Sequence, residues 1–97
     1  VERAEVLGKT LSHGIESLRH PLVDHVRGRG LLRGVVLTAP HGKLVETAAR
    51  DAGFLVNAAA PDVIRLAPPL IITEAQIDSF LTALPAVLDE AVEMGKA

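Results

Sequence analysis

An arginine within an apolar, β-prone segment is the residue of this chain best suited to bind a ligand. Arg65 lies in the run Val63–Leu70, which contains the consecutive prolines Pro68 and Pro69. A buried cation is costly unless it meets a fixed anion, and a guanidinium can hold a carboxylate through two parallel hydrogen bonds. Arg65 is therefore either half of a structural ion pair or a carboxylate ligand that faces a cleft.

The neighbours of Arg65 predict on which side of the strand its side chain lies. Because side chains alternate along a strand, Arg65 should share a face with Val63 and Ala67, opposite Ile64 and Leu66. Its head group would then emerge at the edge of the domain, just before the proline pair. A rigid bend beside a guanidinium suits a site that must hold planar geometry within narrow limits.

The glycine-rich stretch Gly28–Gly34 has the outline of a dinucleotide-binding fingerprint. That chemistry requires the glycine turn to open a helix whose N-terminus faces the phosphates. Here the strand-forming residues 35–37 follow instead. We expect the glycines to bend one strand, or to separate two short strands, rather than to bind a nucleotide.

The histidines, serines and lysines form no recognisable catalytic or metal-binding set. The histidines lack metal-ligand spacing and are expected to be solvated, and the serines fall on predicted helices without elbow glycines. No lysine has the buried surroundings that an imine-forming lysine needs, so we expect that residue outside this chain. No catalytic, cofactor-binding or metal-binding residue is predicted here. The histidines, serines and lysines considered are His13, His20, His25, His41, Ser12, Ser17, Ser79, Lys9, Lys43 and Lys96.

Composition narrows the classes of function. The 97 residues carry a net charge of −2, with no Tyr or Trp and no basic stripe, which argues against nucleic-acid binding. Without cysteine there is no disulfide framework. The apolar runs are too short to cross a membrane and no signal peptide opens the chain, so we expect a cytoplasmic protein. The chain begins inside a predicted helix and is expected to be a piece of a longer protein.

Two helices are predicted in the first half of the chain. Apolar residues recur every three or four positions from 2 to about 19, a stripe in which Gly8 and Gly14 each lower the helical stability by about 1 kcal/mol. A second helix is predicted over 43–52, with Gly53 as its cap. Its expected buried residues are Leu44, Val45, Ala48, Ala49 and Ala52.

The second half of the chain completes an α+β pattern. Strands are predicted within 23–38, over 54–57 and over 63–66, with a loop between the last two. The final helix should begin at Thr73, whose spacing to Gln76 is that of a capping box, and Pro85 should kink it. The expected fold is a two-layer α+β domain with a small, mainly antiparallel sheet covered by helices.

Three motifs resemble those of the class III, ornithine-type aminotransferases. Val26–Gly34 resembles the VRGxGLxxG strand of that family, Ala52–Asn57 resembles its xGxLVN strand, and Val63–Thr73 resembles its viRlaPPLiit segment. The motifs occur in the family's order and spacing, and the resemblance covers nearly the whole chain. Within the family, the sequence is most similar to the acetylornithine aminotransferases.

The resemblance implies a homodimeric enzyme of fold type I that depends on pyridoxal 5'-phosphate (PLP). Residues 1–97 would be its C-terminal small domain, inactive alone because the PLP-binding residues lie in the large domain. The full enzyme would act on small-molecule amino-acid and 2-oxo-acid substrates, with N-acetylornithine and 2-oxoglutarate as the pair, in arginine biosynthesis. Arg65 occupies the position of the family's substrate-carboxylate arginine. Neither a nucleic acid nor a membrane is expected as a partner.

Two alternatives remain open. The enzyme could catalyse another class III reaction, with ornithine, succinylornithine or 4-aminobutyrate as amino donor, because large-domain residues largely set substrate choice. The chain could also be a non-catalytic interaction module that shares only the fold.

Overall fold

The computed structural model describes residues 2–30, 32–66 and 73–96. Its helices and strands alternate along the chain as the sequence predicts for an α+β domain. In chain order the elements are α1 (Glu2–Ser17), β1 (Val23–Arg29), β2 (Leu32–Leu37), α2 (Gly42–Asp51), β3 (Asn57–Ala60), β4 (Val63–Leu66) and α3 (Glu74–Gly95).

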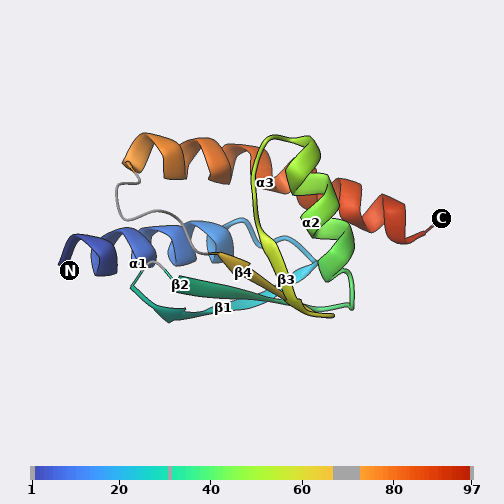
Figure 1. The fold of residues 1–97 in the computed structure, drawn as a ribbon, viewed down its shortest axis with the longest axis horizontal. Coiled ribbons are helices and arrows are strands. Elements are labelled where there is room, and N and C mark those ends of the chain that lie inside the picture. Colours follow the sequence, from blue (N-terminus) through green and yellow to red (C-terminus); the bar gives the residue numbers. More distant parts are fainter. Residues whose placement is uncertain (1, 31, 67–72, 97) are drawn as a thin grey trace.

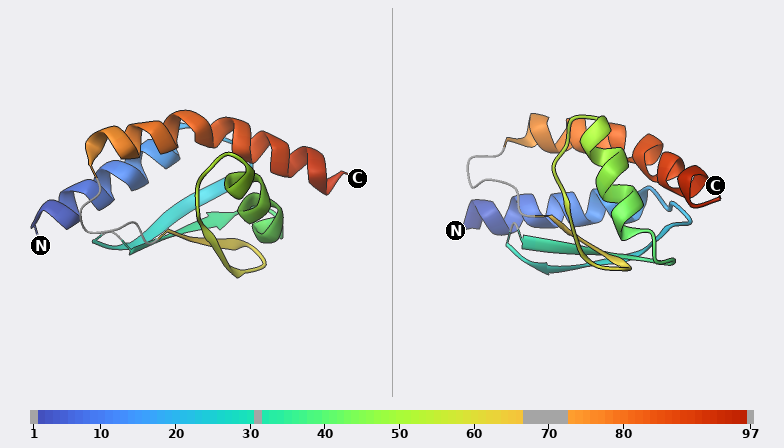
Figure 2. Two further views of the ribbon diagram at one scale, coloured as in Figure 1. Left: turned by 45° about the horizontal axis from the view of Figure 1, so that its top comes forward. Right: turned by 45° about the vertical axis from the view of Figure 1, so that its right-hand side comes forward.

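The four strands form one antiparallel sheet in the order β1-β2-β4-β3. Helices α1 and α2 lie against one face of this sheet, and α3 packs on both helices (Figure 1, Figure 2). No helix of the described chain covers the opposite face, which we call the open face. The predicted two-layer fold is confirmed.

The hydrophobic core lies between the helices and the sheet. On α1 the predicted stripe is confirmed, because Leu7, Leu11 and Ile15 are almost fully buried. Gly14 has a packing role that its low helix propensity does not suggest. A Cβ atom there would lie 2.5 Å from Leu81 Cδ1, so the glycine makes room for the Leu81 side chain of α3.

Helix α2 buries a narrower set of residues than predicted. Val45, Ala48 and Ala49 are buried, but Ala52 is exposed. The prediction for Ala52 was wrong because the helix ends one residue earlier, at Asp51. Gly53 follows with a φ of +94°, which confirms its predicted role in ending the helix.

The prediction of a strand over 54–57 followed by a loop was wrong. Strand β3 is Asn57–Ala60, so the alanines assigned to the loop pair with β4. Phe54 instead turns toward α3, where its ring meets Phe80 edge-on at a centroid distance of 5.3 Å. Alanine has a low β propensity, but the tight turn at 61–62 places these residues beside β4 despite it.

Helix α3 begins as predicted. The Thr73 hydroxyl accepts a hydrogen bond from the Gln76 amide at 3.1 Å, and the Gln76 side chain accepts one from the Thr73 amide at 2.9 Å. The helix continues through Pro85 and is visibly curved (Figure 2). Among the described residues, no helix has the length and apolarity that a membrane crossing requires.

Glu46 of α2 holds the edge strand β3 in place. Its carboxylate accepts a hydrogen bond from the Ala58 amide at 2.9 Å. Lys43 and Arg50 lie 3.7 and 3.9 Å from the same carboxylate. The Ala58 hydrogen bond, aided by these cations, lowers the pKa of Glu46 below its ordinary value of 4.5 despite some desolvation.

We expect Glu46→Gln to weaken the fold at neutral pH and to have less effect in acid. A carboxylate whose pKa is lower in the folded chain contributes its full stabilisation above the unfolded pKa of 4.5 and loses it as pH falls through the folded value. Thermal unfolding followed by circular dichroism should therefore show the two stability curves converging below this pH. Glu93→Gln, at the exposed end of α3, is the control. Parallel curves for wild type and Glu46→Gln would contradict the assignment.

Candidate substrate-binding site

Arg65 lies on the open face near the centre of the sheet. Its neighbours Ile64 and Leu66 are buried against the helices, whereas Arg65 is exposed, so the predicted alternation is confirmed. Within the described residues no carboxylate lies within 4.0 Å of its guanidinium. The structural ion pair considered for Arg65 is therefore absent from this part of the chain. Ala67 and the predicted proline bend lie outside the described residues.

The strand register places Arg65 in a row that crosses the sheet. Arg65 pairs with Gly34 on β2 and with Asn57 on β3, and Gly34 pairs in turn with Arg27 on β1. Directly paired residues point to the same side of a sheet. Arg27 and Asn57, like Arg65, are exposed. The row therefore presents two guanidiniums and one amide on the open face.

A shallow hollow includes Arg27, Gly34 and Arg65 of this row. Residues of all four strands line it, among them Arg27, Arg29, Leu32, Val63 and Arg65. The arginines give the hollow a positive character, and an aliphatic floor separates them. Guanidiniums above an apolar floor suit an organic anion, because they hold its carboxylate while the floor contacts its carbon atoms.

Arg33 is the buried arginine of this domain, although the sequence directs attention to Arg65. Its Nε donates to the Gly30 carbonyl at 2.8 Å and its Nη1 to the Gly28 carbonyl at 3.1 Å. Its Nη2 lies 3.8 Å from Glu5 Oε1 of α1. A structural ion pair of the kind considered for Arg65 is thus formed by Arg33 with Glu5. In the sequence, Arg33 lies two residues before Val35, and side chains two residues apart on a strand share a face. This spacing could have indicated that Arg33 is buried.

The hairpin turn that Arg33 supports packs directly against α1. The Glu5 carboxylate accepts a hydrogen bond from the Gly30 amide at 2.9 Å. A Cβ atom on Gly8 would lie 1.7 Å from the Gly30 carbonyl oxygen and 2.6 Å from Arg33 Nη2. Gly8 therefore lets the helix approach the turn closely enough for these contacts. Gly28 lies in β1 and Gly34 in the antiparallel β2, so the glycines fall in two short strands and not at the start of a helix, as expected.

We expect Gly8→Ala to destabilise the fold by about 2 kcal/mol despite the higher helix propensity of alanine. The new methyl group would meet backbone, which cannot rotate away. Gly14→Ala is the matched control, because its methyl group would meet the end of the flexible Leu81 side chain. Thermal unfolding followed by circular dichroism should rank Gly8→Ala well below Gly14→Ala. Equal stabilities would show that the turn does not constrain α1.

The histidines make no metal site within the described residues, where no group of three or more potential ligands comes together. His13 is exposed on α1, and His25 pairs with Asp24 at 2.7 Å. The prediction of a solvated His20 was wrong, because its side chain is only 10% exposed. Its Nδ1 accepts a hydrogen bond from the Leu22 amide, so its Nε2 donates to Asp89 on α3. His20 thereby ties the end of α1 to α3.

The lysines of this chain do not fit a covalent cofactor site. Lys9 is exposed on α1, and the Lys43 and Lys96 side chains are 81% and 68% exposed. Each of the last two lies within 4.0 Å of a glutamate carboxylate. None is desolvated as a nucleophilic lysine must be. No catalytic step is therefore assigned to a lysine of this chain.

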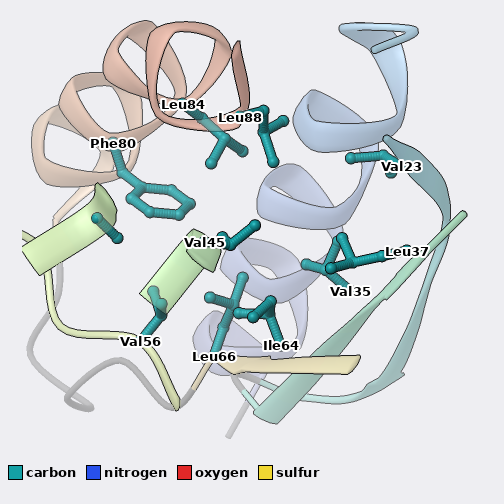
Figure 3. Close-up of a pocket in the computed structure, with 11 residues that line it drawn as sticks. Val23, Val35, Leu37, Val45, Val56, Ile64, Leu66, Phe80, Leu84 and Leu88 are labelled. Atoms are coloured by element: carbon teal, nitrogen blue, oxygen red, sulfur yellow. The ribbon is translucent and has the colours of Figure 1, made fainter. Parts of the chain in front are cut away.

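The enclosed space on the covered side of the sheet belongs to the hydrophobic core. It measures about 20 Å³, and apolar side chains from α2, α3 and the strands converge on it (Figure 3). Among them are Val45, Leu84 and Ile64, with no polar side chain in the lining. Such a space offers nothing to orient a ligand or a water molecule. The hollow on the open face is the stronger candidate for ligand binding.

The fold agrees with what comparison with known proteins shows. The family model for class III aminotransferases matches residues 1–88. The chain belongs to the class III aminotransferase family. This confirms the family resemblance of the three motifs.

Two similar proteins are acetylornithine aminotransferases. The acetylornithine aminotransferase of Mycolicibacterium smegmatis is 78% identical over 93 residues, and that of Mycobacterium leprae is 72% identical over 97. The alignments cover 96% and 99% of this chain but 24% of each relative. The chain thus spans about a quarter of the length of these relatives.

Solved structures agree on the fold. A crystal structure of acetylornithine aminotransferase from Elizabethkingia anophelis matches 92% of this chain and 25% of its own, with a TM-score of 0.84 and 34% identity. A lysine aminotransferase from M. tuberculosis matches 93% of this chain and 22% of its own, with a TM-score of 0.83 and 28% identity.

Proposed function

We propose that this chain is the C-terminal small domain of a PLP-dependent acetylornithine aminotransferase. The full-length protein would transfer the amino group of N-acetylornithine to 2-oxoglutarate, giving N-acetylglutamate 5-semialdehyde and glutamate. The identity of 72–78% to curated acetylornithine aminotransferases supports this substrate pair. A homodimeric assembly, a cytoplasmic location and a place in arginine biosynthesis are part of the same proposal.

Arg65 would bind a substrate carboxylate in this enzyme. The observation that carries the proposal is its exposed guanidinium on the open face, without a carboxylate neighbour in the described residues. Bidentate hydrogen bonds would fix the plane of the substrate carboxylate and so orient the bonds at the reacting carbon. PLP supplies the electron sink for transamination when bound, and its binding residues would lie outside this chain.

A substrate panel on the full-length protein tests the proposed reaction. With 2-oxoglutarate as acceptor, N-acetylornithine should give the highest kcat/KM among N-acetylornithine, ornithine, succinylornithine and 4-aminobutyrate. A higher value for another donor would assign another class III reaction. No transamination with any of the four, in protein loaded with PLP, would favour the non-catalytic module.

The isolated 97-residue chain is expected to be inactive and to bind PLP only nonspecifically. Its lysines are solvated, so each should react weakly and none in preference to the others. Incubation with PLP, reduction with borohydride and mass spectrometry should detect no stoichiometric adduct at a single lysine. The full-length protein, treated in parallel, is the positive control. A single stoichiometric adduct in the isolated chain would overturn the assignment of the cofactor site to the rest of the protein.

A further inference from the structure

Arg27 lies where it could contact the same ligand as Arg65. The two residues occupy one row of the sheet, separated only by Gly34 of β2. Adjacent strands are about 5 Å apart, so about 10 Å separates the two backbones. Two arginine side chains can reach a common anion across that distance, provided that nothing stands between them.

Gly34 leaves that space free. A Cβ atom built on Gly34 would lie 3.9 Å from Arg27 Cγ and 3.6 Å from Val63 Cγ1. The aliphatic part of Arg27 therefore lies beside the bare backbone of Gly34 on β2. Arg29, by contrast, pairs with Leu32, whose side chain is 58% exposed and stands beside it.

The charges on the open face also point to an anion. Within residues 3–30, 32–66 and 73–96, no carboxylate lies within 4.0 Å of Arg27 or Arg65. Arg33, on the covered face, has its own carbonyl and carboxylate partners. Two cations held in one row repel each other, and an anion placed between them relieves that repulsion.

We propose that Arg27 is a second substrate-binding residue, which contacts the same substrate carboxylate as Arg65 across Gly34. This inference rests on the proposed aminotransferase function. Arg65 would hold the carboxylate in its plane, and Arg27 would add a second charged contact from the side of β1. Gly34 would then be required for ligand access rather than for backbone conformation, since it has no positive φ.

Steady-state kinetics of the full-length enzyme test this inference. We expect Arg27→Gln to raise the KM for 2-oxoglutarate about fivefold or more, because a charged contact to the carboxylate is lost. Arg27→Lys should retain part of the affinity. Arg50→Gln is the control: it removes the same charge from an exposed arginine of α2, on the helical side of the sheet, and its KM should stay near the wild-type value.

A double-variant cycle separates a shared ligand from a structural effect. If both arginines hold one carboxylate, their effects should not be independent. The double variant Arg27→Gln, Arg65→Gln should then raise KM by a smaller factor than the product of the two single-variant factors. Gly34→Val should also raise KM without lowering the melting temperature, because valine favours a strand but fills the space beside Arg27. A role of Arg27 confined to stability would instead lower the melting temperature and leave KM unchanged.

The outcomes distinguish this inference from the proposed function. One outcome would overturn the inference and leave the proposed function standing. In that outcome Arg65→Gln loses affinity, whereas KM stays at the wild-type value in Arg27→Gln, Arg27→Lys and Gly34→Val. Strictly additive effects of the two arginines would also overturn it, because they would place the arginines on separate groups. A wild-type enzyme without transaminase activity would overturn the proposed function and the inference together.

Discussion

Arg65→Ala in the full-length enzyme is expected to raise the KM for both the amino-acid and the oxo-acid substrate by about an order of magnitude or more. A hydrogen bond to a charged group contributes about 1.5–3 kcal/mol, and a bidentate contact loses two such bonds at once. The folded structure should survive, because the guanidinium is exposed and makes no ion pair within the described residues. Thermal unfolding of the variant should therefore resemble that of the wild type.

Two further variants sharpen this test. Arg65→Lys keeps the positive charge but loses the planar fork, so its KM should lie between those of the wild type and Arg65→Ala. Arg50→Ala removes an arginine that is 63% exposed on α2, on the helical side of the sheet, and is the control. Wild-type kinetics for Arg65→Ala would rule out the carboxylate-binding role.

Arg33→Met is expected to destabilise the fold by about 3 kcal/mol. Methionine fills a similar volume but donates no hydrogen bond, so the carbonyls of Gly28 and Gly30 lose their side-chain donor. Glu5 of α1 loses its cationic neighbour as well. These losses fall together at the junction between the hairpin and the first helix, where backbone from both elements is closely packed.

Denaturant unfolding followed by far-ultraviolet circular dichroism measures this effect, since the chain has no Trp or Tyr for fluorescence. Arg29→Met is the control: it removes an exposed arginine from the same hairpin and should change stability by less than about 0.5 kcal/mol. If Arg33→Met matched this control, the buried hydrogen bonds would not contribute to the fold as the geometry indicates.

Local patterns in the sequence predicted the helices and the orientation of Arg65. The apolar stripe of α1 and the capping box at Thr73 depend on neighbours within one or two helical turns. The exposure of Arg65 follows from the alternation of side chains along one strand. Such features depend on few long-range contacts, so the sequence was sufficient to predict them.

Strand β3 and the role of Arg33 could not be predicted in this way. The alanines of β3 have little β propensity, but pairing with β4 and the hydrogen bond from Ala58 to Glu46 hold them in the sheet. Arg33 finds its carboxylate at Glu5 of α1, more than twenty residues earlier in the chain. No local pattern carries information on either contact.

The role proposed for Arg65 rests on the sequence, because a guanidinium within a family motif indicates a carboxylate ligand. The tertiary structure decided which arginine is buried and which remains available. It assigned the buried ion pair to Arg33 and placed Arg27 beside Arg65 across Gly34. The physical reason is that the register between β1, β2 and β4 determines which side chains share a row, and register arises from packing of the whole domain.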